Sequence, residues 1–148
     1  ITEELNLNGV DQGSTNTLTI KSVTNVYKRI VTVPADTDTT IANFSSTVGA
    51  SDGALDVEDV KYIRVTNLDS SNSVNLSLQV DAGEDDSAAD ESCTILLEAG
   101  KSFIMGTPSD SVAVSDADAT IVTTLHNLES ILVDSLTNAV KLEIFIAS

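Results

Sequence analysis

Short runs in which apolar and polar residues alternate recur along most of the chain. In segment 74–80, Val and Leu occupy every second position and Asn, Ser and Gln occupy the positions between them. Segment 140–146 alternates in the same way. Successive side chains of a β-strand point to opposite faces of a sheet, so each run predicts a strand with one buried face.

The same pattern, together with the turn residues between the runs, predicts further strands. They are expected at 17–21, 26–33, 41–44, 60–68, 94–98, 101–106 and 111–114. The segment 46–58 is rich in Gly, Ser and Asp and is interpreted as a long surface loop.

Two pairs of these strands are expected to form hairpins. Strand 60–68 would meet 74–80 across the polar connection Asp69-Ser70-Ser71-Asn72. Strand 94–98 would meet 101–106 through the tight turn Ala99-Gly100, where glycine allows the positive φ that such turns often need.

Segment 116–136 is open to two interpretations. Five of its apolar residues recur at helical spacing, whereas the β-branched pair Ile121-Val122 and the alternation of Ile131 with Val133 favour strands. We favour strands. The chain is then predicted to be all-β, an antiparallel β-sandwich of jelly-roll type with about nine or ten short strands.

The pattern divides the chain into an arm and one domain. Residues 1–16 show little periodicity and hold Gly9 and Gly13 among polar residues, which predicts an extended N-terminal arm. Residues 17–148 are predicted to form a single β-sandwich domain. Ordering the arm costs ~1–2 kcal/mol per residue in backbone entropy and its apolar surface is small, so we expect it to order on contact with a neighbour.

The acidic charge balance narrows the range of partners. The chain has 23 acidic and 7 basic residues, a net charge of -16. Nucleic acid is not an expected partner, because binding phosphates requires clustered Lys and Arg. No basic residue lies between Lys101 and Lys141, which argues against docking on an anionic membrane. The acidity is interpreted as a solubility device that salt screens, with complementarity to a basic partner as the alternative.

No stretch approaches the length of a membrane span. The segment 1–5 also lacks the basic and apolar regions of a signal peptide. A soluble chain is therefore expected, which either folds in the cytoplasm or has lost its leader.

No pattern of reactive residues predicts catalysis. His126 is the only histidine and no Gly-x-Ser-x-Gly motif accompanies it, so no catalytic residue is assigned and the chain is predicted not to be an enzyme. Cys93 is the only cysteine, which excludes an internal disulfide, and it is expected to act as a small core hydrophobe. One His and one Cys cannot supply the four ligands of a zinc site.

The acidic segment 81–91 is the one candidate for a cation. Its carboxylates are Asp81, Glu84, Asp85, Asp86, Asp90 and Glu91, and Ca²⁺ prefers oxygen ligands. Their spacing does not match the EF-hand, and charge runs of this kind are usually solvated. No metal or cofactor is therefore assigned, and calcium is kept as the alternative for this loop.

Three segments carry a resemblance to a known family. They are Tyr62 to Leu68 leading into 74–80, Leu96 to Phe103, and Leu128 to Ile146. They resemble small β-sandwich virion proteins of tailed phages, especially marine cyanophages, including those that decorate or cement the capsid. The likeness covers roughly residues 60–147 and consists of strand and turn patterns.

The resemblance implies a position and a partner. It implies a protein on the capsid exterior that binds the major capsid protein at junctions between coat subunits and stabilises the head. Decoration proteins commonly match the three-fold symmetry of a shell, so it also implies a homo-oligomer, with a trimer favoured. Phe145, which is expected on the exposed side of the last strand beside Lys141 and Glu143, is the candidate contact.

The alternative function is a carbohydrate- or receptor-binding module of a phage fibre or cell-surface assembly. Sugar sites generally stack a ring of the ligand on an exposed aromatic side chain. The aromatic residues available for this purpose are Tyr27, Phe44, Tyr62, Phe103 and Phe145.

Overall fold

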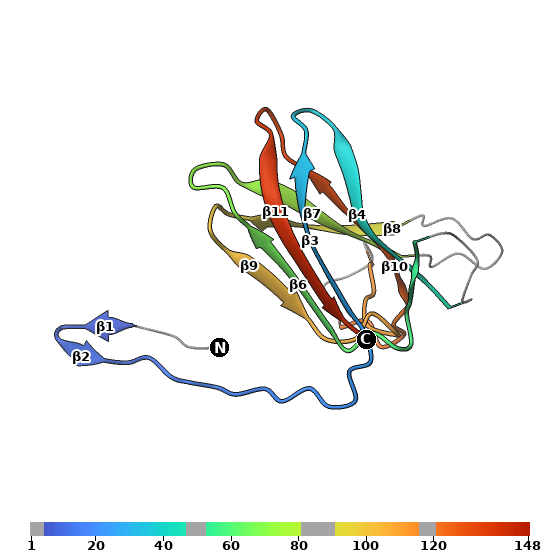
Figure 1. Ribbon diagram of the computed structural model, residues 1–148, viewed down its shortest axis with the longest axis horizontal. Helices are drawn as coiled ribbons and strands as arrows, with labels where there is room; N and C mark the ends of the chain where they lie inside the picture. Colours follow the sequence, from blue (N-terminus) through green and yellow to red (C-terminus); the bar gives the residue numbers. More distant parts are fainter. Residues whose placement is uncertain (1–4, 47–52, 81–90, 116–120) are drawn as a thin grey trace.

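Two β-sheets that face each other form the body of the protein, and the N-terminal segment extends away from them (Figure 1). The structure is a computed structural model that describes residues 5–46, 53–80, 91–115 and 121–148. One sheet holds, in spatial order, β5 (Leu55–Asp56), β4 (Asp38–Ser45), β10 (Leu128–Asp134), β7 (Val74–Val80) and β8 (Glu91–Leu97). The other holds β3 (Val26–Val33), β11 (Val140–Ala147), β6 (Tyr62–Asn67) and β9 (Ser102–Met105). A separate pair, β1 (Asn6–Leu7) and β2 (Val10–Asp11), lies in the arm.

The strand order is that of a jelly roll. Apart from the two-residue β5, which is parallel to β4, all pairs are antiparallel. Without β5, the body has eight strands, which can be counted from first to eighth along the chain. Their spatial order is first-eighth-third-sixth in one sheet and second-seventh-fourth-fifth in the other. The predicted all-β jelly-roll sandwich is therefore confirmed. Eleven strands are present in the described residues, where nine or ten were expected. Within the same ranges no helix is long and apolar enough to cross a membrane.

The inward faces of the strands make one aliphatic core. In β7 the four apolar residues are buried and the three polar residues between them point outward, as the alternation predicts. In β11 the same period buries Val140, Leu142, Ile144 and Ile146. Both sheets contribute to the largest fully buried side chains, which include Ile63, Leu76, Leu128, Ile131 and Ile144. Removing this apolar surface from water is the main stabilising contribution.

Both predicted hairpins are wrong, because the chain changes sheet at each turn. β6 pairs with β11 and β9, whereas β7 pairs with β10 and β8. β8 and β9 likewise lie in different sheets. Two strands with one apolar face each can lie side by side or face each other across a core, and alternation does not distinguish these arrangements. The turn itself was predicted correctly, since Gly100 has a φ of 70° and Lys101 N donates to the Glu98 carbonyl.

Three other predictions need correction. Residues 17–21 are in no strand, and Leu18 is 73% exposed, because alternation produces a strand only where a sheet and a core accept it. Segment 46–58 is not all surface loop, since β5 pairs with β4 and Val57 is buried. The expected strand 111–114 is reduced to an isolated bridge between Val112 and His126.

The ambiguous segment 116–136 contains a strand. β10 confirms the strand interpretation for Leu128–Asp134. It pairs with β4 and β7 and is therefore the centre of its sheet. Residues 116–120 lie outside the described residues.

Asn67 joins the two sheets where the chain crosses between them. Its side chain is fully buried, and its amide donates to the carbonyls of Asn72 and Leu97 at 2.8 and 3.2 Å. Its Oδ1 accepts from the backbone N–H of Asp69 at 2.9 Å. Its backbone N–H donates to Lys101 O, and its carbonyl accepts from Gly100 N. One residue thus connects the ends of β6, β7, β8 and β9.

Asp69 holds the crossing segment in shape beside Asn67. Its Oδ1 accepts from the backbone N–H groups of Ser71 and Asn72 and from the Asn72 amide. These donors, with the Asn72 backbone N–H the strongest, hold the pKa of Asp69 below its ordinary value of 3.8.

The buried amide of Asn67 allows a stability test. Asn67→Ala leaves the Asn72 and Leu97 carbonyls without this donor, so we expect a loss of about 2–3 kcal/mol in the free energy of unfolding, measured by urea denaturation. The matched control is Asn43→Ala, at an exposed position of β4, which should change stability by no more than about 0.5 kcal/mol. Equal effects of the two changes would contradict the role given to Asn67.

Candidate functional site

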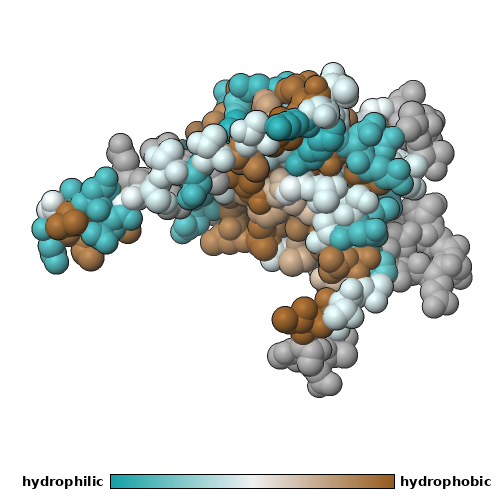
Figure 2. Space-filling model, turned by 90° about the horizontal axis from the view of Figure 1, so that it is seen from below, coloured by the Kyte–Doolittle hydropathy of each residue, from teal (hydrophilic) through white to brown (hydrophobic). Residues whose placement is uncertain are grey.

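The arm, residues 5–25, carries apolar side chains that its own chain leaves exposed. Its tip is the hairpin of β1 and β2, which turns through Asn8 and Gly9, both with positive φ. Its exposed apolar residues are Leu5, Leu7, Val10, Leu18 and Val23. Figure 2 shows brown side chains at the left end of the arm, well separated from the body. The predicted arm is thus longer than expected, because residues 17–25 extend it.

The base of the arm is held firmly on the body. The carbonyl of Ser148 accepts from the backbone N–H groups of Thr24 and Asn25 at 2.7 and 2.8 Å. Ser148 N in turn donates to the Asn25 carbonyl at 3.0 Å. The Lys61 ammonium donates to the carbonyl of Ser22, which has a φ of 57°. These contacts set the direction in which the arm leaves the body.

The outer side of the sheet β3-β11-β6-β9, here called the aromatic face, combines rings with exposed aliphatic residues. Tyr62 and Phe145 meet edge to face, with ring centroids 6.1 Å apart. The guanidinium carbon of Arg64 lies 5.6 Å from the Phe145 centroid, within cation–π range. The aliphatic residues of this face are Val26, Ile30 and Ile104, which are all exposed. A surface of this composition is typical of protein contact sites.

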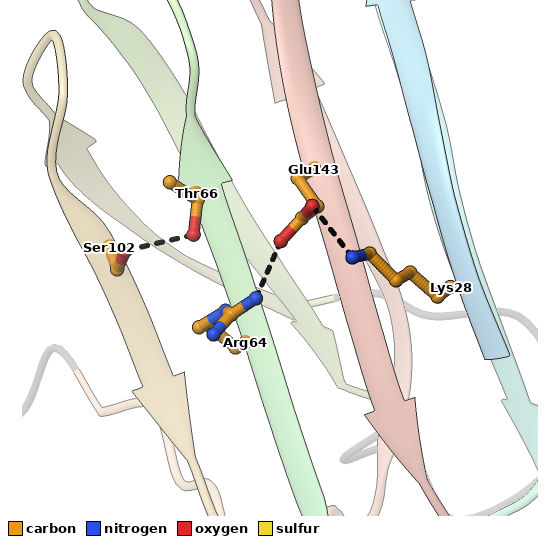
Figure 3. A network of polar contacts seen from close by, with 5 residues as sticks. All are labelled: Lys28, Arg64, Thr66, Ser102 and Glu143. Atoms are coloured by element: carbon orange, nitrogen blue, oxygen red, sulfur yellow. Dashed lines mark hydrogen bonds and ion pairs between the residues drawn. The ribbon is translucent and has the colours of Figure 1, made fainter. Parts of the chain in front are cut away.

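A network of two ion pairs that share Glu143 crosses the aromatic face. Glu143 on β11 contacts the Lys28 ammonium of β3 at 3.2 Å and the Arg64 guanidinium of β6 at 2.5 Å (Figure 3). The Thr66 and Ser102 hydroxyls form a further cross-strand contact at 2.8 Å. The Lys28 ammonium, and after it the Arg64 guanidinium, hold the pKa of Glu143 below its ordinary value of 4.5, although partial burial acts in the opposite direction.

The outer side of the sheet β5-β4-β10-β7-β8, here called the polar face, has a different character. A shallow hollow of about 380 Å³ lies on it. Its lining residues are Asp38, Asn75, Ser77, Gln79, Ser92, Thr94, Leu132 and Asp134. Asp38 and Asp134 are direct cross-strand partners, so two carboxylates lie at one end of the hollow. None of the lining residues is aromatic.

The two faces also differ in charge. The aromatic face carries Lys28, Arg64 and Lys141, whereas Arg29 of the same sheet is in register with the buried Ile144 and lies on the inner side. The described strands of the other sheet contain no Lys or Arg. The aromatic face is therefore the side on which this acidic protein presents positive charge.

In the described part of the chain, the candidate residues for catalysis and metal binding are not brought together in one site. His126 pairs through its backbone with Val112, and no catalytic role is assigned to it. Cys93 packs against the core, as predicted. Among the described ranges, no three His, Cys, Asp or Glu residues are grouped to hold a metal ion. Residues 81–90, which carry most of the acidic loop considered for calcium, lie outside the described part of the chain.

The candidate sugar-stacking rings are divided between the core and the surface. Phe44 is buried and Phe103 packs against the core. Tyr27 lies at the edge of the sheet, where its ring centroid is 5.7 Å from the guanidinium carbon of Arg29. Tyr62 and Phe145 lie on the aromatic face, as predicted for Phe145. Sequence reasoning missed the ion pair of Lys28, Glu143 and Arg64, because their strands are distant in the chain and meet only through the sheet register.

Comparison with known proteins leaves the family open. No protein-family model and no curated protein matches the chain. The chain is similar to a solved structure from Bacillus endospore appendages, described as a novel family of disulfide-linked pili. The identity is 12% and the TM-score 0.41, over 90% of this chain and 95% of that chain. A likeness of this degree carries no argument about function.

The ion pair predicts how stability depends on pH. A folded-state pKa below the ordinary value means that the Glu143 contribution is fully present above pH 4.5 and is lost as the pH falls through the folded value. Glu143→Gln should therefore lower the melting temperature at pH 7, and the difference from the unaltered protein should shrink towards pH 3. Thermal melts across this range test it, with Glu98→Gln, a change in the exposed turn, as the control. A difference that is constant with pH would contradict the role of the carboxylate.

Proposed function

We propose that this protein is a non-enzymatic virion structural protein, a capsid decoration protein that binds the major capsid protein at junctions between coat subunits. It would lie on the capsid exterior and stabilise the head as a homo-oligomer, with a trimer favoured. The proposal rests on the resemblance of residues 60–147 to small virion proteins of tailed phages and on surface features of the fold. Jelly rolls occur in viral capsid and lectin domains alike, so the fold by itself does not decide between them.

The observation that carries the proposal is the arm. It leaves the body from a fixed base, and Leu5, Leu7 and Val10 are exposed at its tip. A chain that presents apolar side chains far from its own core gains stability when a neighbouring subunit covers them. Such an arm is suited to joining subunits of an assembly.

The alternative is a carbohydrate- or receptor-binding module, and the hollow of the polar face is what favours it. Its hydroxyl, amide and carboxylate groups suit the hydroxyls of a sugar. The half-buried ring pair, Tyr62 and Phe145, lies on the opposite side of the sandwich. Because no ring of the hollow can stack on a sugar, we rank this function second.

The proposal predicts the abundance of the protein in particles. Mass spectrometry of purified virions should find this chain at a copy number comparable to that of the major coat protein. A handful of copies would point to a tail or fibre part instead, and absence from heads together with clear hits on a glycan array would favour the alternative.

A second prediction concerns the arm. Of the residues removed by deleting 1–16, the described ones, 5–16, contribute no buried side chain to the core, so the melting temperature of the free domain should stay nearly unchanged. The occupancy of the truncated protein on particles should fall, because the apolar contacts at the tip are lost. A loss of several degrees in melting temperature would mean that the segment belongs to the core.

A further inference from the structure

The aromatic face of one copy and the arm of another are complementary in chemistry. The arm exposes Leu5, Leu7 and Val10, and the aromatic face exposes Val26, Ile30 and Ile104. Each therefore offers apolar surface that its own chain does not cover. Burying such surfaces against each other removes both from water.

Their charges are complementary as well. Residues 5–20 of the arm contain one acidic residue, Asp11, and no Lys or Arg, while Lys21 follows near the base; in the sequence Glu3 and Glu4 precede them. The aromatic face carries Lys28, Arg64 and Lys141. Opposite charges on two surfaces favour their encounter and set their register.

The polar face is a poorer receptor for the arm. Its apolar residues are few, chiefly Leu96 and the half-buried Leu132. It has no Lys or Arg in its described strands, and Asp38 and Asp134 would repel an acidic segment. Docking of the arm on the aromatic face can therefore be distinguished by experiment from docking on the polar face.

The arm does not cover its own aromatic face, since Leu7 and Val10 at its tip and Ile30 and Ile104 on that face are all exposed. Its base is fixed by the backbone bonds of Thr24 and Asn25 to Ser148, and Leu18, eight residues before β3 begins at Val26, is still 73% exposed. Sixteen residues, 5–20, span at most ~55 Å when extended. A strand of eight residues is ~27 Å long, so the arm can cross a neighbouring sheet.

We infer that the arm of one copy docks on the aromatic face of a second copy of this chain. The apolar tip residues cover Ile30, Ile104 and Phe145, and Asp11 of the arm lies beside Lys28 and Arg64. This inference deepens the proposed function and rests on it, because it names the surface through which the proposed oligomer forms.

Disulfide trapping between two differently tagged forms of the full chain tests the inference. Both carry Cys93→Ser; one adds Leu7→Cys in the arm and the other Ile104→Cys on β9. Mixed and oxidised, they should form a disulfide-linked dimer that contains both tags. The matched control replaces Ile104→Cys by Leu96→Cys, an exposed leucine of the polar face. Docking raises the local concentration of the paired thiols, so the Ile104 pair should react at least ~10-fold faster than the control.

Two results would overturn the inference. Equal rates for the two pairs, including no dimer with either, would mean that the arm does not recognise the aromatic face. A single chain carrying both Leu7→Cys and Ile104→Cys that closes on itself as a looped monomer would place the arm on its own sheet. Thermal melts of every variant establish that each is folded. Because the assay uses the isolated protein, its failure is distinct from absence of the protein in virions, which concerns the proposed function alone.

Discussion

The buried amide of Asn67 is the interaction on which the arrangement of the two sheets depends. It satisfies carbonyls of Asn72 and Leu97 and accepts from Asp69, all on segments that pass between the sheets. A buried polar group without partners is costly, so this amide stabilises one crossing geometry over others. Ser135 has the same role where the chain crosses after β3 and after β10, since its buried hydroxyl donates to the Pro34 carbonyl at 2.6 Å.

These crossings give the protein two unlike outer surfaces. Because consecutive strands of the body, β7 and β8 excepted, lie in different sheets, the aromatic face is assembled from its first, third, sixth and last strands. Its basic residues come from strands that are distant in the chain, and Glu143 between Lys28 and Arg64 joins three of those strands. The opposite sheet keeps its acidic and amide side chains around a hollow. A chain with a net charge of -16 thus has one side on which acidic partners are favoured.

The arm and the core are stabilised by different means. The core residues are buried by their own chain, whereas the apolar residues of the arm are left exposed by it. The hydrogen bonds that join Ser148 to Thr24 and Asn25 lie where the arm meets the body.

The sequence by itself determined the secondary structure of most of the body. The alternation in segments 74–80 and 140–146 has a period of two, which only a strand can use to bury one face, and β7 and β11 follow it. The positive φ of Gly100 was also predictable, because it depends on local backbone sterics. The absence of a reactive motif, and Phe145 on the outer side of the last strand, were likewise local observations.

The tertiary structure alone decided which strands pair and what lies on each face. The pattern of Leu18 and Ile20 is that of a strand, yet no sheet accepts it. The turn at Asp69 to Asn72 looks like a hairpin, yet Asn67 directs the chain to the other sheet. Alternation predicts that one face of a strand is buried, but it does not predict which strands cover that face, because the free energy of burial is not directional. Directional bonds at the crossings select the partner, and they join residues that only the folded chain brings together.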